Sequence, residues 1–357
     1  MTSDAYHELD SQWRSVRDLE SLRSSQLSGL AGELLTEASS DPRCQRLRDG
    51  EIYRLVSDAV DGDAYLIPGL LSFQDQAQLL SALICDWATP PNRSNLWPAE
   101  APESGEWLQE GLAKFFDMSE DSPDPSSLSV IEKLRWVTMG KQYDWSSRCY
   151  LPDDCRPLPE LLVSFATRAV DLLKDAGEID NTHTFQAAIC NLYHAARRPS
   201  DRLGGHRDDV EEDTTSPLVT ISIGLPCVFL LGKETRSSKP IPLLLTAGSM
   251  LVLTNRARQA YHGVPTILVP PKLQMKGRTF RRASPASWDP TFDWAYRPWL
   301  VANDSGGAPP EPFDSTVPEA IHYLLTRARV SFSIRSVDVK IPAEESEQKI
   351  LRETCWD

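Results

Sequence analysis

Residues 218 to 254, LVTISIGLPCVFLLGKETRSSKPIPLLLTAGSMLVLT, decide the fold class of this chain. Glycine, proline and polar residues separate four short runs of apolar and β-branched residues: Leu218 to Ile223, Cys227 to Leu231, Ile241 to Thr246 and Met250 to Thr254. Many short strands divided by turn residues are typical of an antiparallel sandwich or barrel. Ala247 and Gly248 predict a hairpin turn between the last two runs.

Further strands and helices are predicted on both sides of this stretch. Strands are expected at Tyr65 to Ile67, Gln186 to His194 and Arg329 to Val337. Ser72 and Asp75 have the spacing of a capping box and predict a helix through Trp87. Apolar residues from Leu161 to Leu173 recur at helical spacing, with Gly177 placed as a C-terminal cap, and a further short helix is expected at Glu319 to Thr326.

The composition describes a folded chain of 357 residues with 41% apolar content, enough to fill a core. No run of about eighteen apolar residues predicts a membrane span, and the opening MTSDAYHELD does not have the pattern of a secretory signal. We therefore expect an intracellular protein of the cytoplasm or nucleus, with the mitochondrion left open. The seven scattered cysteines, without a CxxC pair, predict neither a disulfide framework nor a zinc site.

The formal net charge of -14 argues against binding to phosphates, but the charge is unevenly distributed. Thr235 to Trp288 contains no acidic residue and nine basic ones: Arg236, Lys239, Arg256, Arg258, Lys272, Lys276, Arg278, Arg281 and Arg282. Removing these nine positive charges from -14 leaves -23 for the rest of the chain. This segment is either a surface that binds an anionic partner or a solvated basic edge without a ligand.

His206, Arg207 and Asp208 form the only His-x-Asp motif of the chain, in a glycine-rich segment that we expect to be a loop. Alone the motif is weak evidence, because a surface histidine would produce it as well. His262 follows the predicted strand Met250 to Thr254 and offers a second imidazole. Two imidazoles and one carboxylate form the facial triad of non-haem iron oxygenases, with open positions for an oxoacid and dioxygen.

An oxoacid needs a second anchor for its distal carboxylate. Arg329 and Arg335 lie on the same face of the predicted final strand, because their positions differ by an even number, and either could supply a bidentate guanidinium. Both could instead be exposed charges on the outside of the barrel.

Several motifs in sequence order extend this pattern: LRWVTMGKQYDW, ICNLYH, GGHRDD, PLVTISIGLPCVFLLG, LLLTAGSMLVLTNRARQAYHGVP and ARVSFSIRSV. Over Leu134 to Val337 the chain resembles the AlkB family of nucleic-acid dealkylating dioxygenases, in particular its AlkB homologue 1 branch. The resemblance implies an α+β fold with a double-stranded β-helix, or jelly-roll, core and flanking helices. It further implies Fe(II), 2-oxoglutarate as cosubstrate and O2.

The resemblance also assigns roles to individual residues. His206, Asp208 and His262 would bind the iron and be the catalytic residues, and Arg329 would bind the distal carboxylate of 2-oxoglutarate. The same pocket would be lined by Asn191, Tyr193, Ser331 and Arg335. Trp136 would lie near the substrate base, and Tyr143 would be its neighbour.

Two departures from the family pattern bear on these roles. The last strand usually reads Arg-x-Asn-x-Thr-x-Arg, whereas Ser331 and Ser333 replace the Asn and Thr here, which shortens a polar contact near the cofactor. After the iron carboxylate, Asp209 and Val210 stand where some members carry an acid that contacts the base. The preferred base is therefore not transferred to this chain.

The implied reaction is oxidative demethylation of a nucleobase in tRNA, other RNA or DNA. The enzyme must bring the methyl group to the metal, so the substrate is expected to be single-stranded, looped or flipped out of a duplex. We expect Trp136 to stack on the base and Arg256, Arg258, Arg278, Arg281 and Arg282 to border the substrate path and bind phosphates. Trp136 could instead be a core residue.

Two other functions are compatible with the pattern. One is an oxygenase of the same fold that hydroxylates or demethylates a protein or a small molecule, which the acidic net charge favours and the acid-free segment opposes. The other is a catalytically silent binding module, which the complete triad and Arg329 oppose. The chain is expected to be a monomer without membrane association.

The predicted organisation has three parts. Residues 1–60 form a helical or flexible extension, and 61–337 form the dioxygenase domain. That domain has its jelly-roll core at about 185–337, with an insertion at about 272–318 that contains three tryptophans. Residues 338–357 form a peripheral tail.

Overall fold

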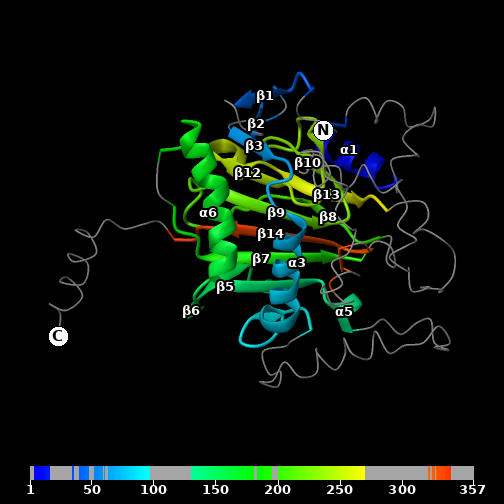
Figure 1. Ribbon diagram of the computed structural model, residues 1–357. Coiled ribbons are helices and arrows are strands. Elements are labelled where there is room, and N and C mark those ends of the chain that lie inside the picture. The colour runs from blue at the N-terminus through cyan, green and yellow to red at the C-terminus, as the bar shows by residue number, and fades with distance from the viewer. Residues whose placement is uncertain are drawn as a thin grey trace, which may run out of the picture.

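The computed structural model describes residues 4–16, 34–35, 40–47, 52–58, 60, 63–96, 130–180, 183–194, 200–269, 321, 324–325 and 327–338. Within these ranges the chain folds into two antiparallel sheets with helices packed on the outside (Figure 1). The predicted insertion at 272–318 and almost all of the predicted tail lie outside the described residues.

The larger sheet has ten strands. Nine follow one another in the order β1 (Cys44–Leu47), β2 (Ile52–Leu55), β3 (Asp63–Ile67), β12 (Met250–Thr254), β9 (Leu218–Gly224), β14 (Arg329–Arg335), β7 (Ala187–Tyr193), β5 (Trp136–Asp144) and β4 (Arg93–Ser94). The tenth strand, β6 (Cys149–Cys155), pairs with β5 to form a hairpin. Strand β14 lies between β9 and β7, so its two arginines, Arg329 and Arg335, project from the middle of the sheet and not from its edge.

The smaller sheet has four strands, in the order β11 (Ile241–Leu245), β10 (Cys227–Leu231), β13 (His262–Ile267) and β8 (Leu203–His206). Apolar side chains of β10 and β11 form one cluster with Leu251 and Leu253 of the larger sheet. The two sheets therefore face each other across a shared interior, as in a jelly roll.

Helices α3 (Phe73–Ala82) and α6 (Glu160–Asp175) both cross the same face of the larger sheet (Figure 1). The π-helical turn η2 (Leu83–Trp87) continues α3. Helix α1 (Ala5–Trp13) contacts β8 and β13 of the smaller sheet. The short helices α5 (Val130–Lys133) and η3 (Asn255–Gln259) complete the described elements.

The alternation of side chains along β14 separates the core from the site. Val330, Phe332 and Ile334 belong to the core cluster that includes residues of α3 and α6. Arg329 and Arg335 point to the opposite face, which is directed toward the smaller sheet, because residues two apart in a strand share a face. The same strand thus stabilises the fold with one face and supplies polar groups with the other.

Most predicted elements are confirmed. The four runs of residues 218 to 254 are strands, as are the predicted segments before and after them. Ser72 and Asp75 form a complete capping box. Gly177 follows α6 with a positive φ of 77°, and the described residues Ile321, Leu324 and Leu325 are helical and buried.

The hairpin predicted at Ala247 and Gly248 is wrong. The strand before this turn, β11, belongs to the smaller sheet and the strand after it, β12, to the larger one. The turn is a corner between sheets. Gly248 has a φ of 76°, and an added Cβ would lie 2.6 Å from the carbonyl oxygen of Leu71, so glycine is required here.

The N-terminal region, predicted as a helical or flexible extension over residues 1–60, contains strands as well as a helix. Helix α1 is present, but β1 and β2 add two strands to the edge of the larger sheet next to β3. Their short runs, CQRL and IYRL, carry too little periodicity to be recognised alone. The proposed boundary between extension and domain stays a prediction. Among the described residues, no helix has both the length and the apolar character needed to cross a membrane.

Candidate active site

His206 and His262 are both strand residues, although a loop was expected around His206. They lie opposite each other in the antiparallel pairing of β8 with β13, and their ring centroids are 4.5 Å apart. The Nδ1 atom of each ring lies 3.0 Å from a backbone carbonyl oxygen, that of Gly204 for His206 and that of Ala260 for His262. Because a carbonyl only accepts, Nδ1 carries the proton and Nε2 keeps its lone pair for a metal.

Asp208 completes the cluster from the segment that follows β8. Its Oδ1 lies 3.7 Å from Nε2 of His206, and its Oδ2 lies 3.7 Å from Nε2 of His262. One potential ligand atom from each of the three residues lies within 4.8 Å of the other two. Two imidazole nitrogens and one carboxylate oxygen that converge in this way match the donor set of a facial iron triad.

Nearby charges determine the protonation of these groups. Burial acts to raise the pKa of Asp208, but Arg335 and the two histidines outweigh it and lower that pKa far below its ordinary value. Burial lowers the pKa of His262 to about 4, with His206 acting in the same direction. A carboxylate and a neutral imidazole are the forms that bind metal, so the cluster fits Fe(II).

A second set of charges lies behind Asp208. Nη1 of Arg335 is 3.0 Å from Asp208 Oδ2 and 2.9 Å from Oε1 of Glu211. Arg258 donates to the backbone oxygen of Asp208 at 3.0 Å, and its Nη2 lies 3.3 Å from Oε2 of Glu211. Two buried guanidinium groups and two carboxylates therefore compensate one another and orient Asp208.

Arg329 is 1% exposed and lies on the same face of β14 as Arg335. Its Nη2 donates to Ser222 Oγ at 3.1 Å and its Nη1 to the Leu225 carbonyl at 3.4 Å, while its Nε has no hydrogen-bond partner among the described residues. None of the described residues gives Arg329 a carboxylate. A buried guanidinium without a counter-charge is costly, and the distal carboxylate of 2-oxoglutarate would supply one.

Other predicted pocket residues surround Arg329. Tyr193 lies opposite Arg329, and Asn191 opposite Ser331, in the pairing of β7 with β14. Burial raises the pKa of the Tyr193 phenol, so this group stays protonated. The structure thus brings together the four residues and separates their roles from that of Arg335, which already holds Asp208 and Glu211.

Trp136 and Tyr143 belong to an aromatic cluster on the β5–β6 hairpin. Trp136 is half-buried and lies opposite Asn191 in the pairing of β5 with β7. Its ring centroid lies 5.5 Å from that of Trp145. Tyr143 packs edge-on against Trp145 at 4.9 Å and against Tyr150 at 5.2 Å. Trp145 is 45% exposed, so the cluster extends from the pocket wall to the surface.

The residues predicted to bind phosphates differ in where the structure places them. Arg258 is 1% exposed and lies in the charge network behind Asp208, so its assignment to the substrate path is wrong. Arg256 is exposed at the surface, where it forms an ion pair with Glu234 at 3.0 Å. Three further predicted residues lie outside the described part of the chain: Arg278, Arg281 and Arg282.

Three residues of the site were missed: Glu211, Tyr150 and Trp145. Glu211 stands among other acids in DDVEED, and no local pattern separates a buried carboxylate from a solvated one. Tyr150 and Trp145 belong to a hairpin whose second strand has no clear alternation. Only the pairing of β5 with β6 identifies them.

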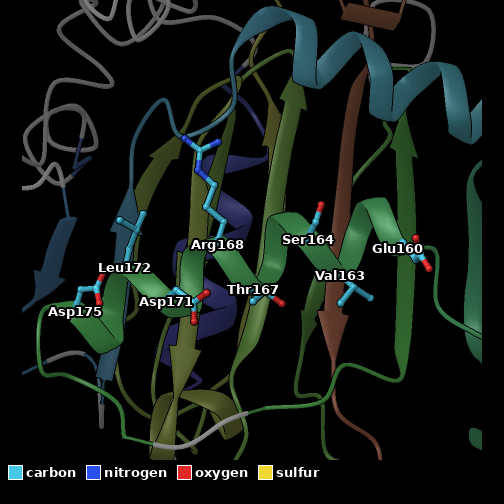
Figure 2. Close-up of a pocket in the computed structure, with 8 residues that line it drawn as sticks. All are labelled: Glu160, Val163, Ser164, Thr167, Arg168, Asp171, Leu172 and Asp175. Carbon is cyan, nitrogen blue, oxygen red and sulfur yellow. The ribbon is translucent and has the colours of Figure 1, made fainter.

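A surface groove of about 580 Å³ lies elsewhere, along α6 (Figure 2). Its lining comes from the outward side of that helix, on which Val163 and Leu172 are partly buried. The lining residues are Glu160, Val163, Ser164, Thr167, Arg168, Asp171, Leu172 and Asp175. Helix α6 packs on the face of the larger sheet opposite to the triad. The groove is therefore separate from the candidate active site.

Together, the jelly roll, the converging triad and the buried arginine define a non-haem iron oxygenase that uses an oxoacid. Residues 63–284 match the family model of the 2OG-Fe(II) oxygenase superfamily, and the chain belongs to this family. Its members bind Fe(II) and use 2-oxoglutarate and O2, in agreement with the donors found here.

Similar proteins agree with the expected resemblance to AlkB. The tRNA demethylase abh1 of Schizosaccharomyces pombe is 35% identical over 217 residues, which are 56% of this chain and 69% of that protein. The DNA N(6)-methyladenine demethylase ALKBH1A of Arabidopsis thaliana is 32% identical over 57% of this chain and 63% of its own length. The alpha-ketoglutarate-dependent dioxygenase AlkB of Escherichia coli is 31% identical over 37% of this chain and 57% of its own length. The AlkB-like assignment, including the homologue 1 branch, is confirmed.

Proposed function

We propose that this chain oxidatively demethylates nucleobases in nucleic acid, with Fe(II) held by His206, Asp208 and His262 and 2-oxoglutarate held by Arg329. When bound, the iron and the oxoacid supply the oxidation of a methyl carbon by O2, with release of succinate and carbon dioxide. One oxygen atom enters the N–CH3 group and the other enters succinate. The N–CH2OH product then releases formaldehyde and leaves an N–H group on the base.

The observation that carries this proposal is the position of three kinds of groups around one interior. The triad lies on the smaller sheet side, and the buried Arg329 lies on the central strand of the larger sheet. Trp136 extends the same wall beside Asn191. A planar aromatic side chain at the edge of an oxidising site favours a flat, aromatic substrate group such as a base.

The names of the relatives support nucleic acid as the substrate, since one is called a tRNA demethylase and another a DNA demethylase. We propose a single-stranded, looped or flipped-out base, because a base stacked in a duplex cannot reach the interior. All candidate ligands come from one chain, so we propose that the monomer is active.

The alternative is an oxygenase of the same family that acts on a protein. Two of the arginines that were predicted to border the substrate path, Arg256 and Arg258, lie inside the described residues, and both favour this alternative. Arg258 is buried against Glu211, and Arg256 pairs with Glu234. We therefore expect Arg258 to take no part in phosphate binding and Arg256 to contribute less than the sequence indicated. The remaining support for phosphate binding comes from residues 272–282, whose contribution stays a prediction.

The test is to incubate the iron-loaded protein with total tRNA, single-stranded DNA and duplex genomic DNA, and to measure all modified nucleosides before and after. We expect one N-methylated nucleoside to decrease with formaldehyde released in equal amount, and faster in single-stranded or looped substrates. Succinate formation without any change in nucleosides would instead support the protein oxygenase.

A further inference from the structure

The β5–β6 hairpin carries the aromatic residues that we assign to the substrate, and one hydrogen bond connects it to the charge network behind the metal site. The hydroxyl of Tyr150, on β6, donates to Oε1 of Glu211 at 2.9 Å. The ring of Tyr150 packs 5.2 Å from that of Tyr143, which contacts the exposed Trp145. Tyr150 therefore has an aromatic neighbour on the hairpin and a carboxylate neighbour outside it.

Glu211 connects this hydrogen bond to the metal-binding carboxylate. Its Oε1, which accepts the hydrogen bond from the Tyr150 hydroxyl, also lies 2.9 Å from Nη1 of Arg335. The same Nη1 lies 3.0 Å from Oδ2 of Asp208. Three successive polar contacts of 2.9 to 3.0 Å therefore connect the hairpin to the candidate metal ligand. They join Tyr150 to Glu211, Glu211 to Arg335, and Arg335 to Asp208.

The charges along this path make it sensitive to geometry. The Glu211 and Arg335 side chains are 2% and 4% exposed, so little water is present to replace a hydrogen bond that breaks. Arg335 is shared between Asp208 and Glu211. A shift of Glu211 therefore changes how strongly Arg335 holds Asp208, and a metal that binds Asp208 changes how Arg335 holds Glu211.

We propose that Tyr150 is a positioning residue that couples occupancy of the metal site to the order of the β5–β6 hairpin. Metal binding to Asp208 leaves Arg335 and Glu211 as a tighter pair, and Glu211 then fixes the Tyr150 hydroxyl and, through the ring, the substrate-facing aromatics. The benefit to the enzyme is that the hairpin is arranged for substrate only when the oxidising centre is loaded. The assignment of the hairpin to substrate rests on the proposed function.

The experiment is hydrogen–deuterium exchange of the full chain with and without Mn(II) and 2-oxoglutarate, in the absence of nucleic acid. Mn(II) is a redox-stable substitute that accepts the same donors. In the wild type we expect loading to slow exchange in Cys149–Cys155 as well as in His262–Ile267. In Tyr150→Phe we expect the slowing at Cys149–Cys155 to fall by at least half, while that at His262–Ile267 persists.

The chain provides a matched control in Tyr65, whose hydroxyl donates to Oε2 of Glu178 at 3.0 Å. Tyr65→Phe removes the same kind of hydrogen bond from β3, which lies away from the triad, and should leave both responses to loading as in the wild type. If Tyr150→Phe lowers thermal stability more than Tyr65→Phe, Glu211→Gln serves as the second variant. It is measured at Mn(II) concentrations that saturate it, where slowing at His262–Ile267 should persist and slowing at Cys149–Cys155 should fall by at least half.

The possible outcomes lead to different conclusions. Equal slowing of the hairpin in Tyr150→Phe and the wild type would overturn the coupling, as would a wild-type hairpin that does not respond while His262–Ile267 does. A wild type in which neither segment responds to Mn(II) and 2-oxoglutarate would count against the metal site and thus against the proposed function itself.

Discussion

His206 and His262 lie directly opposite each other in the pairing of β8 with β13, so the spacing of two strands sets the distance between two candidate metal ligands. Their ring centroids are 4.5 Å apart, and both Nδ1 atoms are held by backbone carbonyls of residues two positions earlier. The two imidazoles are therefore arranged before a metal arrives. Asp208 alone depends on side-chain contacts for its orientation.

We predict that His206→Ala, Asp208→Ala and His262→Ala each abolish iron-dependent succinate formation, because each removes one of three protein ligands. Their effects on stability should differ. His262 is 6% exposed and stacks on Phe229 at 5.7 Å. Its truncation should therefore cost about 1 to 3 kcal/mol. Truncation of the half-exposed His206 should lower the free energy of unfolding by less. Thermal unfolding of both variants would measure this difference.

His7→Ala serves as the control for these variants, since His7 is exposed on α1. It should change neither succinate formation nor unfolding. Near-normal turnover in any one of the three ligand variants would refute the triad assignment.

Arg329→Lys should raise the KM for 2-oxoglutarate at least about tenfold although the charge is conserved. An ammonium cannot form two parallel hydrogen bonds to one carboxylate, and each tenfold corresponds to about 1.4 kcal/mol. The affinity for Mn(II) should stay unchanged, because Arg329 contacts no metal ligand among the described residues. Steady-state kinetics over a range of 2-oxoglutarate concentrations, with Mn(II) titration alongside, would measure both.

Arg93→Lys is a suitable control, because Arg93 forms a part-exposed ion pair with Asp154. Its KM should equal that of the wild type. An unchanged KM in Arg329→Lys would move the oxoacid-binding role to another residue of the pocket.

Glu211→Gln should weaken Mn(II) binding about tenfold, the lower end of what removal of an outer-shell partner costs. Glu211 accepts from Arg335 and compensates Arg258. Without its charge both guanidinium groups depend on Asp208, which then competes less well for the metal. Isothermal titration with Mn(II) would measure the dissociation constant.

Glu178→Gln is the matched control, since Glu178 likewise accepts from a tyrosine, Tyr65, and pairs with an arginine, Arg54. It should leave Mn(II) affinity unchanged. A Glu211→Gln dissociation constant within about twofold of the wild-type value would mean that the charge network does not support the metal site.

The sequence predicted those parts of the fold whose residues carry a local pattern. The run MLVLT is a strand and Ser72 caps a helix, because β-branched and capping residues act over a few positions. Strands β8 and β13 were missed because LGGH and HGVPTI contain glycines and a proline, and pairing between them overrides weak local propensity. The prediction of a hairpin at Gly248 was wrong because the whole fold, and not the local sequence, determines which sheet a strand joins.

The site divides in the same way. The His-x-Asp motif and His262 predicted the cluster that the structure brings together, whereas strand spacing left Arg329 and Arg335 as equal candidates and only the family resemblance chose Arg329. Arg258 was misassigned because a basic residue near a ligand has the same sequence signature whether it faces a phosphate or a buried carboxylate. Glu211, its partner 47 positions earlier in the numbering, is brought to it only by the folded sheets.

Basic residues that bind nucleic acid should be separable from those that support the metal. Arg278, Arg281 and Arg282 follow the strand that begins with His262, in a segment of the sequence without acidic residues. Neutralising the three to Gln should weaken binding of a single-stranded oligonucleotide and reduce the slope of log K against log salt by up to about 2, since each neutralised phosphate contributes about 0.7 to that slope. Succinate formation without nucleic acid should not change.

Arg258→Gln provides the contrast, because Arg258 is buried against Glu211 and the backbone of Asp208. It should lower Mn(II) affinity and leave the salt slope as it is. Trp136→Ala should lower oligonucleotide affinity by about 1 to 3 kcal/mol without changing the slope, since stacking displaces no counterions. If the triple variant binds with unaltered affinity and slope, phosphates are not held by residues 278–282, and the protein oxygenase becomes the better explanation of the site.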